Sequence, residues 1–227
     1  MDTFFAEARE DDVALQTLHE IWPSDEAIEE LVEHCDGSFI FASTLAKFVI
    51  GGTGNSDPRT PMERLPLALE INPGIDGVYT EILSRAQHLP HFLTVISTIA
   101  RLVEPLSISA MSALLGLSTY DVLRVLIPLQ SILQVPGRDD LPITVFHTSV
   151  RDFLTDKNRS GDIHSPVSHH AFLFHRCMDL LIGTEPTANT ETNKYAMINW
   201  PMHVEKAILA GCMEVEKAIL AGCMEVD

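Results

Sequence analysis

The chain has 227 residues, of which 46% are hydrophobic and 7% are aromatic. This composition is typical of a globular protein with one or two domains and is too apolar for a disordered chain. No apolar run reaches the roughly 18 residues of a membrane span, and the N-terminus lacks the basic and apolar regions of a secretory signal. We therefore expect a soluble, cytoplasmic protein without a membrane partner.

The formal net charge is −17. A surface this acidic repels nucleic acid and anionic lipid, and it also keeps a protein in solution. The four cysteines are sparse and form no CxxC pair. They predict free thiols in a reducing compartment.

Residues 1–20 are polar and acidic and predict an acidic tail or a short helix, whereas residues 21–88 predict a helical domain. Ser24 is a good N-cap for the first helix of this domain, and Gly37 is placed to end it. The next helix, from about residue 38 to 50, is apolar nearly all round. This pattern indicates a buried helix.

Further helices are predicted at about 60–70 and 75–88, after a loop from Gly51 to Thr60. The loop is rich in glycine, but it does not match a phosphate-binding loop. Such a loop needs a lysine directly after its last glycine, and no glycine of this chain is followed by lysine.

Residues 89–156 predict a winged-helix domain, whose first helix is opened by Pro90. The predicted inward face of that helix consists of Phe92, Leu93, Val95, Ile96, Ile99, Leu102 and Val103. Ser107 can cap a short helix that ends at Gly116, and Ser118 can cap the next one. Two short helices joined by a tight glycine turn form a helix-turn-helix pattern.

The β-rich segments 131–135 and 143–147 flank a turn and predict a hairpin. A helix-turn-helix followed by a hairpin is a winged helix. A further helix is expected to start near Thr148 or Ser149.

Residues 157–227 predict a helical C-terminal segment: a polar linker at 157–165, a helix from about 167 to 182, a loop, and helix again from Tyr195. Residues 204–214 recur without change as 215–225. An 11-residue period would extend one apolar helical stripe without drift. The stripe would consist of Val204, Ile208, Cys212, Val215, Ile219 and Cys223.

We interpret the repeat as a short duplication or an error in the gene sequence. Gly211 and Gly222 would each cost a helix about 1 kcal/mol relative to alanine. Residues 215–227 are expected to be frayed or to pair with another chain, and to be dispensable for folding.

Three stretches resemble, in order and spacing, the region that follows the nucleotide-binding core of NACHT-type STAND NTPases, particularly the large fungal NLR-like set. Residues 22–44 are similar to the end of the NACHT module, and parts of residues 104–136 to the family's winged-helix region. Residues 146–154 are similar to its His-x-Ser-x-Arg-Asp-Phe-Leu signature. The resemblance covers residues 20 to about 203.

The resemblance implies a nucleotide sensor at His147, Arg151 and Asp152, because the signature is similar to the MHD motif, whose histidine contacts the β-phosphate of ADP. The third residue of that motif is Thr148 here rather than aspartate. The P-loop and the magnesium-binding carboxylates are missing. We therefore expect a family member truncated before its NTPase core, with no cofactor unless a core that binds ADP or ATP is present upstream or in trans.

The predicted function is a non-catalytic regulatory and scaffold region of a NACHT/STAND-type signalling ATPase. We expect protein partners, either a nucleotide-binding module or a second copy of the chain. A stand-alone protein-interaction domain of helical type is an alternative. A winged helix that binds nucleic acid is a further alternative, but the helix from Ser118 to Gln130 offers only Arg124 and Gln130 to base edges, beside an acidic surface.

Two other kinds of site were weighed. A zinc site could draw on His164, His169, His170, His175 and Cys177. Their spacing does not match the i, i+4 pairs of a helical zinc site, so no metal is predicted. A hydrolase could use His147, Ser149 and Asp152, but no GxSxG elbow frames the serine and helix capping explains it better. The chain is therefore not predicted to be an enzyme.

Overall fold

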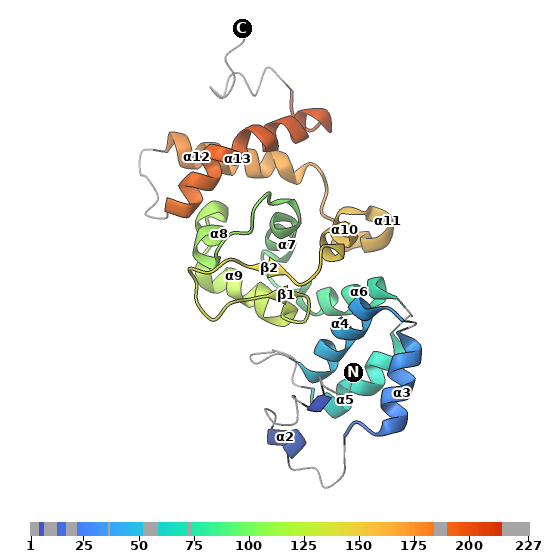
Figure 1. The fold of residues 1–227 in the computed structure, drawn as a ribbon. Coiled ribbons are helices and arrows are strands. Elements are labelled where there is room, and N and C mark those ends of the chain that lie inside the picture. The colour runs from blue at the N-terminus through green and yellow to red at the C-terminus, as the bar shows by residue number, and fades with distance from the viewer. Residues whose placement is uncertain are drawn as a thin grey trace. The chain divides into compact units, whose positions relative to one another are not determined.

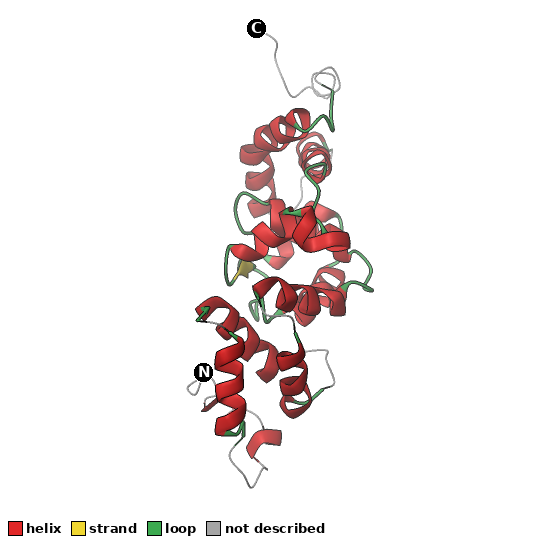
Figure 2. Cartoon of the chain, turned by 90° about the vertical axis from the view of Figure 1, so that its right-hand side faces the viewer, coloured by secondary structure: helices red, strands yellow, loops and turns green. Residues whose placement is uncertain are grey.

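The computed structural model describes residues 5–6, 13–16, 22–35, 37–51, 59–71, 74–183 and 190–214. The described chain is mainly helical and contains one small two-stranded sheet (Figure 2). The predicted class, mainly α, is confirmed. The chain divides into two compact units. Unit 1 comprises Met1–Ala86 and Ile127–Leu133, and unit 2 comprises Gln87–Leu126 and Gln134–Asp227.

Unit 1 contains five described helices and a 3₁₀ turn. They are α2 (Val13–Gln16), α3 (Asp25–His34), α4 (Phe39–Ile50), α5 (Pro61–Glu70), α6 (Ile75–Ala86) and the 3₁₀ turn η1 (Ile127–Leu129). The hydroxyl of Ser24 accepts the amide of Ala27, as predicted for an N-cap. Thr60 and Glu63 form a reciprocal capping box at the start of α5. Helix α3 ends at His34, slightly before the predicted end, and Gly37 follows with φ +73°.

The core of unit 1 is built around α4, as its apolar sequence predicts. Phe41, Leu45, Phe48 and Val49 are almost completely buried. Phe39, the first residue of the helix, is the exception, with 76% of its surface exposed. The prediction of a buried helix is therefore confirmed for all but its first turn.

Unit 2 contains a longer series of elements (Figure 1). They are α7 (Phe92–Arg101), α8 (Ile108–Leu115), α9 (Thr119–Leu126), β1 (Leu133–Gln134), β2 (Thr144–Val145), α10 (Ser149–Thr155), α11 (Lys157–Ser160), the 3₁₀ turn η2 (Gly161–Ile163), α12 (His169–Ile182) and α13 (Thr190–Leu209). Strand β1 begins at the last residue of unit 1.

The helix pair α8 and α9 forms where the sequence predicts it. Ser107 caps α8 by accepting the amide of Ala110, and Gly116 ends the helix in the left-handed conformation at φ +68°. Ser118 accepts the amide of Asp121 at 3.1 Å and so caps α9. The chain direction bends by 115° between the two helices.

Three expectations for unit 2 are wrong. Leu93 and Val103, both predicted on the inward face of the helix opened by Pro90, are each 48% exposed, and Val103 lies beyond the end of α7. Helix α11 and the turn η2 replace much of the polar linker predicted at 157–165, because the Asp156 side chain caps α11. Helix α13 starts at Thr190 rather than at Tyr195.

The end of α13 also differs from the expectation for the repeat. Gly211, at φ +67°, donates its amide to the Ile208 carbonyl, and Cys212 donates to the Ala207 carbonyl. This pair of bonds is a Schellman cap, so Gly211 lies beyond the helix rather than inside it. The predicted stripe through Cys212 is therefore wrong, and Cys212 is exposed. The predictions for residues 215–227 lie outside the described residues.

Among the described helices, none is by itself both long and apolar enough to cross a membrane. The pair α8 and α9 reaches the required composition only when combined across its 115° bend.

Candidate functional site

His147, the predicted sensor histidine, lies between β2 and α10 and is half-buried. Its Nδ1 accepts the backbone amide of Ser149 at 3.1 Å and lies 2.8 Å from the Ser149 hydroxyl. The imidazole thus binds an amide at the start of α10, a role that the sequence assigned to Ser149. Because Nδ1 accepts a hydrogen bond, the proton of the neutral ring lies on Nε2.

The other two predicted sensor residues lie elsewhere on α10. The Arg151 guanidinium donates to the Leu102 carbonyl at 3.0 Å, at the C-terminal end of α7, and its Nε is buried without a partner. The Asp152 side chain is exposed. The structure therefore brings His147 together with Ser149, whereas Arg151 links α10 to α7.

The His147–Ser149 contact has the distance of a nucleophile–base pair, but its surroundings differ from those of a catalytic triad. The Nδ1 lone pair that would take the serine proton already accepts the Ser149 amide. Within the described residues, no carboxylate forms a hydrogen bond to Nε2 that would orient the ring.

A groove of about 700 Å³ lies between the α8–α9 pair and the hairpin turn. It is lined by Ile108, Thr119, Leu123, Pro136, Gly137, Arg138, Asp139 and Asp140. The Arg138 guanidinium donates two hydrogen bonds to the Asp140 carboxylate, at 2.9 and 2.5 Å. These bonds lower the pKa of Asp140 and raise that of Arg138. The one cationic side chain of this groove is therefore paired with an acid.

The second polar cluster of unit 2 is buried between α12 and α13. The Nδ1 atoms of His170 and His203 lie 2.8 Å apart, and the Tyr195 hydroxyl lies 2.8 Å from Nε2 of His203. His203 is completely buried, and His170 and Tyr195 are 6% and 4% exposed. We call these three residues the His–Tyr chain.

The proton positions in the His–Tyr chain follow from its surroundings. Burial raises the pKa of the Tyr195 hydroxyl, so it keeps its proton and can donate it to Nε2 of His203. His203 then carries its proton on Nδ1 and donates it to Nδ1 of His170. Each hydrogen bond holds one proton, and both imidazoles are neutral.

Burial keeps these histidines neutral. Desolvation, together with the neighbouring histidines, lowers the pKa of His203 to about 3. Desolvation and the charges of Arg101 and Lys206 lower the pKa of His170 to about 4. His169, whose Nε2 lies 2.9 Å from the Thr98 hydroxyl, has a pKa lowered to about 4 mainly by desolvation.

Sequence reasoning missed His203 and Tyr195 as partners of His170. A signal was present: Tyr195, Asn199 and His203 recur every fourth residue and so share one helical face. All three are buried. Polar residues on the buried face of a helix require partners inside the protein.

The residues weighed as zinc ligands do not gather in one place. His175 is exposed on α12, whereas Cys177 is fully buried and burial raises the pKa of its thiol to about 12. A thiol with that pKa stays protonated at neutral pH, and zinc binds the thiolate. No group of three or more His, Cys, Asp or Glu side chains in the described part of the chain could hold a metal ion.

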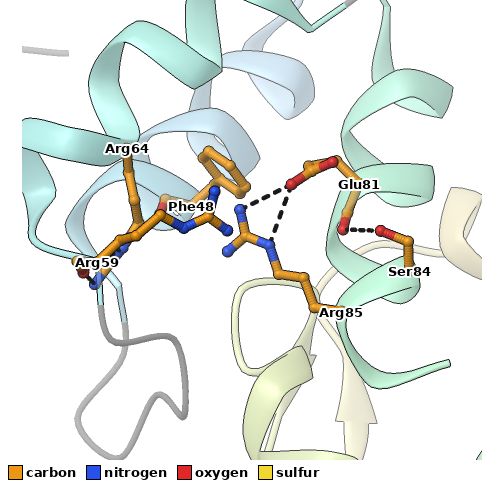
Figure 3. Close-up of polar contacts among 6 residues, drawn as sticks. All are labelled: Phe48, Arg59, Arg64, Glu81, Ser84 and Arg85. Atoms are coloured by element: carbon orange, nitrogen blue, oxygen red, sulfur yellow. Dashed lines mark hydrogen bonds and ion pairs between the residues drawn. The ribbon is translucent and has the colours of Figure 1, made fainter. Parts of the chain in front are cut away.

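Unit 1 has its own buried polar side chain, Arg64, which is 5% exposed. Its guanidinium donates to the carbonyls of Arg59 and of Val49, the latter in the last turn of α4. Arg85 from α6 lies over the Phe48 ring at 4.2 Å and pairs with Glu81 at 3.1 Å (Figure 3). These contacts link α4 to α5 and α6 within unit 1.

Two polar clusters therefore stand out in unit 2: His147 with its proton on Nε2, and the buried His–Tyr chain. The first is half-exposed and can reach a ligand. The second is buried and links α12 to α13 through hydrogen bonds. Comparisons of the chain with models of known protein families, with curated proteins and with solved structures find no match.

Proposed function

We propose that this chain is a non-catalytic regulatory and scaffold region of a NACHT/STAND-type, NLR-like signalling ATPase. In this proposal the segment from α8 to α10 is a winged helix. The 115° bend between α8 and α9, the left-handed Gly116 and the following pair of short strands support that assignment.

The observation that carries the proposal is the fixed orientation of His147. Its Nδ1 is held by the Ser149 amide, so the ring presents an Nε2–H donor from a half-buried position beside the hairpin. A hydrogen-bond donor in that place suits a phosphate oxygen of a nucleotide. In the proposed complex, a nucleotide-binding core supplies the P-loop and the magnesium ligands, and His147 senses the ADP that the core holds.

In this proposal the chain is non-catalytic because it lacks the groups that phosphoryl transfer requires. Phosphoryl transfer depends on a lysine, a magnesium ion and backbone amides that surround the phosphates. The sequence contains no P-loop, because none of its glycines precedes a lysine. His147 alone can donate one hydrogen bond, which can report the nucleotide state but cannot drive hydrolysis.

The test is binding in trans. A NACHT-type nucleotide-binding core, loaded with ADP, is titrated with the full chain by calorimetry. We expect binding that weakens about tenfold in His147→Ala, the loss of one charge-assisted hydrogen bond. His175→Ala, which removes an exposed imidazole on α12, is the matched control and should bind as the parent does. Equal affinity of the parent and His147→Ala would overturn the sensor role.

The proposal also excludes nucleic acid as a partner. The net charge is −17, Arg138 is paired with Asp140, and Arg124 lies over the Tyr120 ring at 5.7 Å. Specific DNA binding needs cationic side chains that are free to reach phosphates. A gel shift at low salt should show no complex with duplex DNA, whereas salt-sensitive binding at micromolar concentration would contradict this part of the proposal.

A further inference from the structure

The His–Tyr chain lies where α12 and α13 pack side by side (Figure 1). The two helices share a small apolar cluster in which Phe174 and Val204 are buried and Trp200 is packed against them. At the opposite end of α13, Glu191 accepts two hydrogen bonds from Ser107, at the N-terminus of α8. The packing of α13 therefore depends on polar contacts at more than one point.

The hydrogen bonds of the His–Tyr chain exist only in one protonation state. The two Nδ1 atoms lie 2.8 Å apart, and with the Tyr195 hydroxyl donating to Nε2 of neutral His203, His203 donates from Nδ1 and His170 accepts. A proton added to His170 would occupy that Nδ1, and two N–H donors would then face each other at 2.8 Å. A proton added to His203 would occupy Nε2 and oppose the Tyr195 hydroxyl in the same way. Either proton therefore breaks a buried hydrogen bond and leaves a buried charge.

The neighbouring charges make an imidazolium less favourable still. Arg101 on α7 and Lys206 on α13 act on His170, and both are positive. Glu104 and Arg151, which have opposite signs, act on Tyr195. The charges that act on the imidazoles themselves therefore oppose protonation.

In the described part of the chain, one more histidine and one thiol lie near the His–Tyr chain. The histidine is His169 on α12, whose Nε2 forms a hydrogen bond with the Thr98 hydroxyl on α7. Thr98 in turn donates to the Thr94 carbonyl, so it accepts from His169. Cys177, also on α12, is a buried thiol. Helix α8 contributes the Ala110 carbonyl, which accepts from Thr192 and carries no charge.

From this geometry we infer that the contact between α12 and α13 is an acid-sensitive clasp, which opens when the His170–His203 pair takes up protons. Opening separates the faces around Phe174 and Trp200 and exposes both imidazoles to water. The inference does not depend on the proposed nucleotide sensor, because it uses none of the residues around His147.

The sign of the pH effect follows from the lowered pKa values. An unfolded histidine has a pKa of about 6.5, and the two buried imidazoles have values of about 4 and about 3. The clasp is therefore fully stable above about pH 6.5 and weakens as the pH falls from there toward about 4, because the open state binds protons that the closed state excludes.

The experiment uses the full chain with Trp22→Phe, which leaves Trp200 as the only tryptophan. Its fluorescence is followed from about pH 7.5 down to about pH 3.5, and we expect one transition near pH 5 that takes up more than one proton. His170→Gln and His203→Gln remove one titrating group each while keeping an amide for the hydrogen bond. Each should move the midpoint down by about half a pH unit or more.

His175→Gln, on the exposed face of the same helix, is the control and should leave the midpoint unchanged. The inference is overturned if Trp200 fluorescence does not change above about pH 3.5, or if the three variants share the midpoint of the parent. Should the buried variants fail to fold, NMR titration of the parent histidines decides the question. Two imidazoles that titrate near pH 6.5 in the folded chain would contradict the clasp.

Discussion

The two units of this chain bury polar side chains in different ways. Unit 1 buries a permanent charge, Arg64, and satisfies it with backbone carbonyls at the end of α4. Unit 2 buries neutral groups that could become charged, His170, His203 and Tyr195. A guanidinium keeps its charge at every accessible pH, whereas an imidazole does not. Within the described residues, the buried groups that can gain a charge as the pH falls therefore lie in unit 2.

The surface charge of the two units differs as well. Unit 1 contains only five of the 15 lysines and arginines, namely Arg9, Lys47, Arg59, Arg64 and Arg85. Two of these, Arg64 and Arg85, are used in internal contacts with α4. Because unit 1 also contains 17 of the 32 acidic residues, the net negative charge is concentrated there. The half-buried His147 and the His170–His203 pair lie in unit 2.

The largest effect is expected from Arg64→Ala. The substitution leaves the carbonyls of Arg59 and Val49 without their donor and removes the brace at the end of α4. We expect unit 1 to lose about 3 kcal/mol of unfolding free energy. Urea unfolding in a Trp200→Phe background, followed by Trp22 fluorescence, measures the loss, because Trp22 packs edge-on against Phe5 in this unit.

Arg64→Lys separates the effect of the charge from that of the guanidinium geometry. A lysine keeps the charge but cannot reproduce the fork that reaches two carbonyls. It should recover only part of the lost stability. Full recovery would show that charge alone, rather than the guanidinium geometry, holds α4.

Tyr195→Phe is expected to have the next largest effect. It removes the hydroxyl that lies 2.8 Å from the buried Nε2 of His203. We expect thermal unfolding of unit 2 to show a loss of about 2 kcal/mol. Tyr120→Phe, at a tyrosine that is 68% exposed, is the control. An equal effect of both substitutions would mean that the His–Tyr chain contributes nothing.

Ser107→Ala is expected to have a smaller effect. Ser107 caps α8 and also donates its hydroxyl to Glu191 at 2.5 Å, which fixes the start of α13. The expected loss is about 1.5 kcal/mol, measured by chemical denaturation. Ser118→Ala removes an exposed cap of α9 whose second contact, to the Asp121 carboxylate at 2.6 Å, is local and exposed, and it should cost less. The opposite order would show that the Glu191 contact is not formed in solution.

The smallest effect is expected from Arg138→Ala. Its pair with Asp140 is exposed, and water and salt screen such a pair. The unfolding midpoint should not change. A shift as large as that of Ser107→Ala would mean that the hairpin turn stabilises unit 2 more than its exposure indicates.

The sequence predicts local features of this fold better than distant ones. The caps at Ser24, Ser107 and Ser118 and the turn at Gly116 depend on residues within four positions, and all are confirmed. The early start of α13 could not be predicted, because Glu191 is held by Ser107, a residue 84 positions away. Local propensity contains no information about such a contact.

The candidate sites show the same limit. His147 could be singled out from its motif, but its bond to the Ser149 amide requires the local backbone geometry. The sequence groups His170 with its neighbours on one helix, whereas its partner His203 lies 33 residues away on α13. A buried pair is identified by burial and distance, which a helical pattern on one segment cannot supply.

We propose that this chain by itself neither holds a nucleotide nor hydrolyses it. The most direct measurement is a calorimetric titration of the full chain with ADP and magnesium, followed by an ATP hydrolysis assay. The account predicts no saturable binding below about 1 mM and no hydrolysis above the buffer rate, since one histidine donor supplies too little binding energy. A micromolar Kd for ADP with the chain alone, or turnover of ATP, would contradict it.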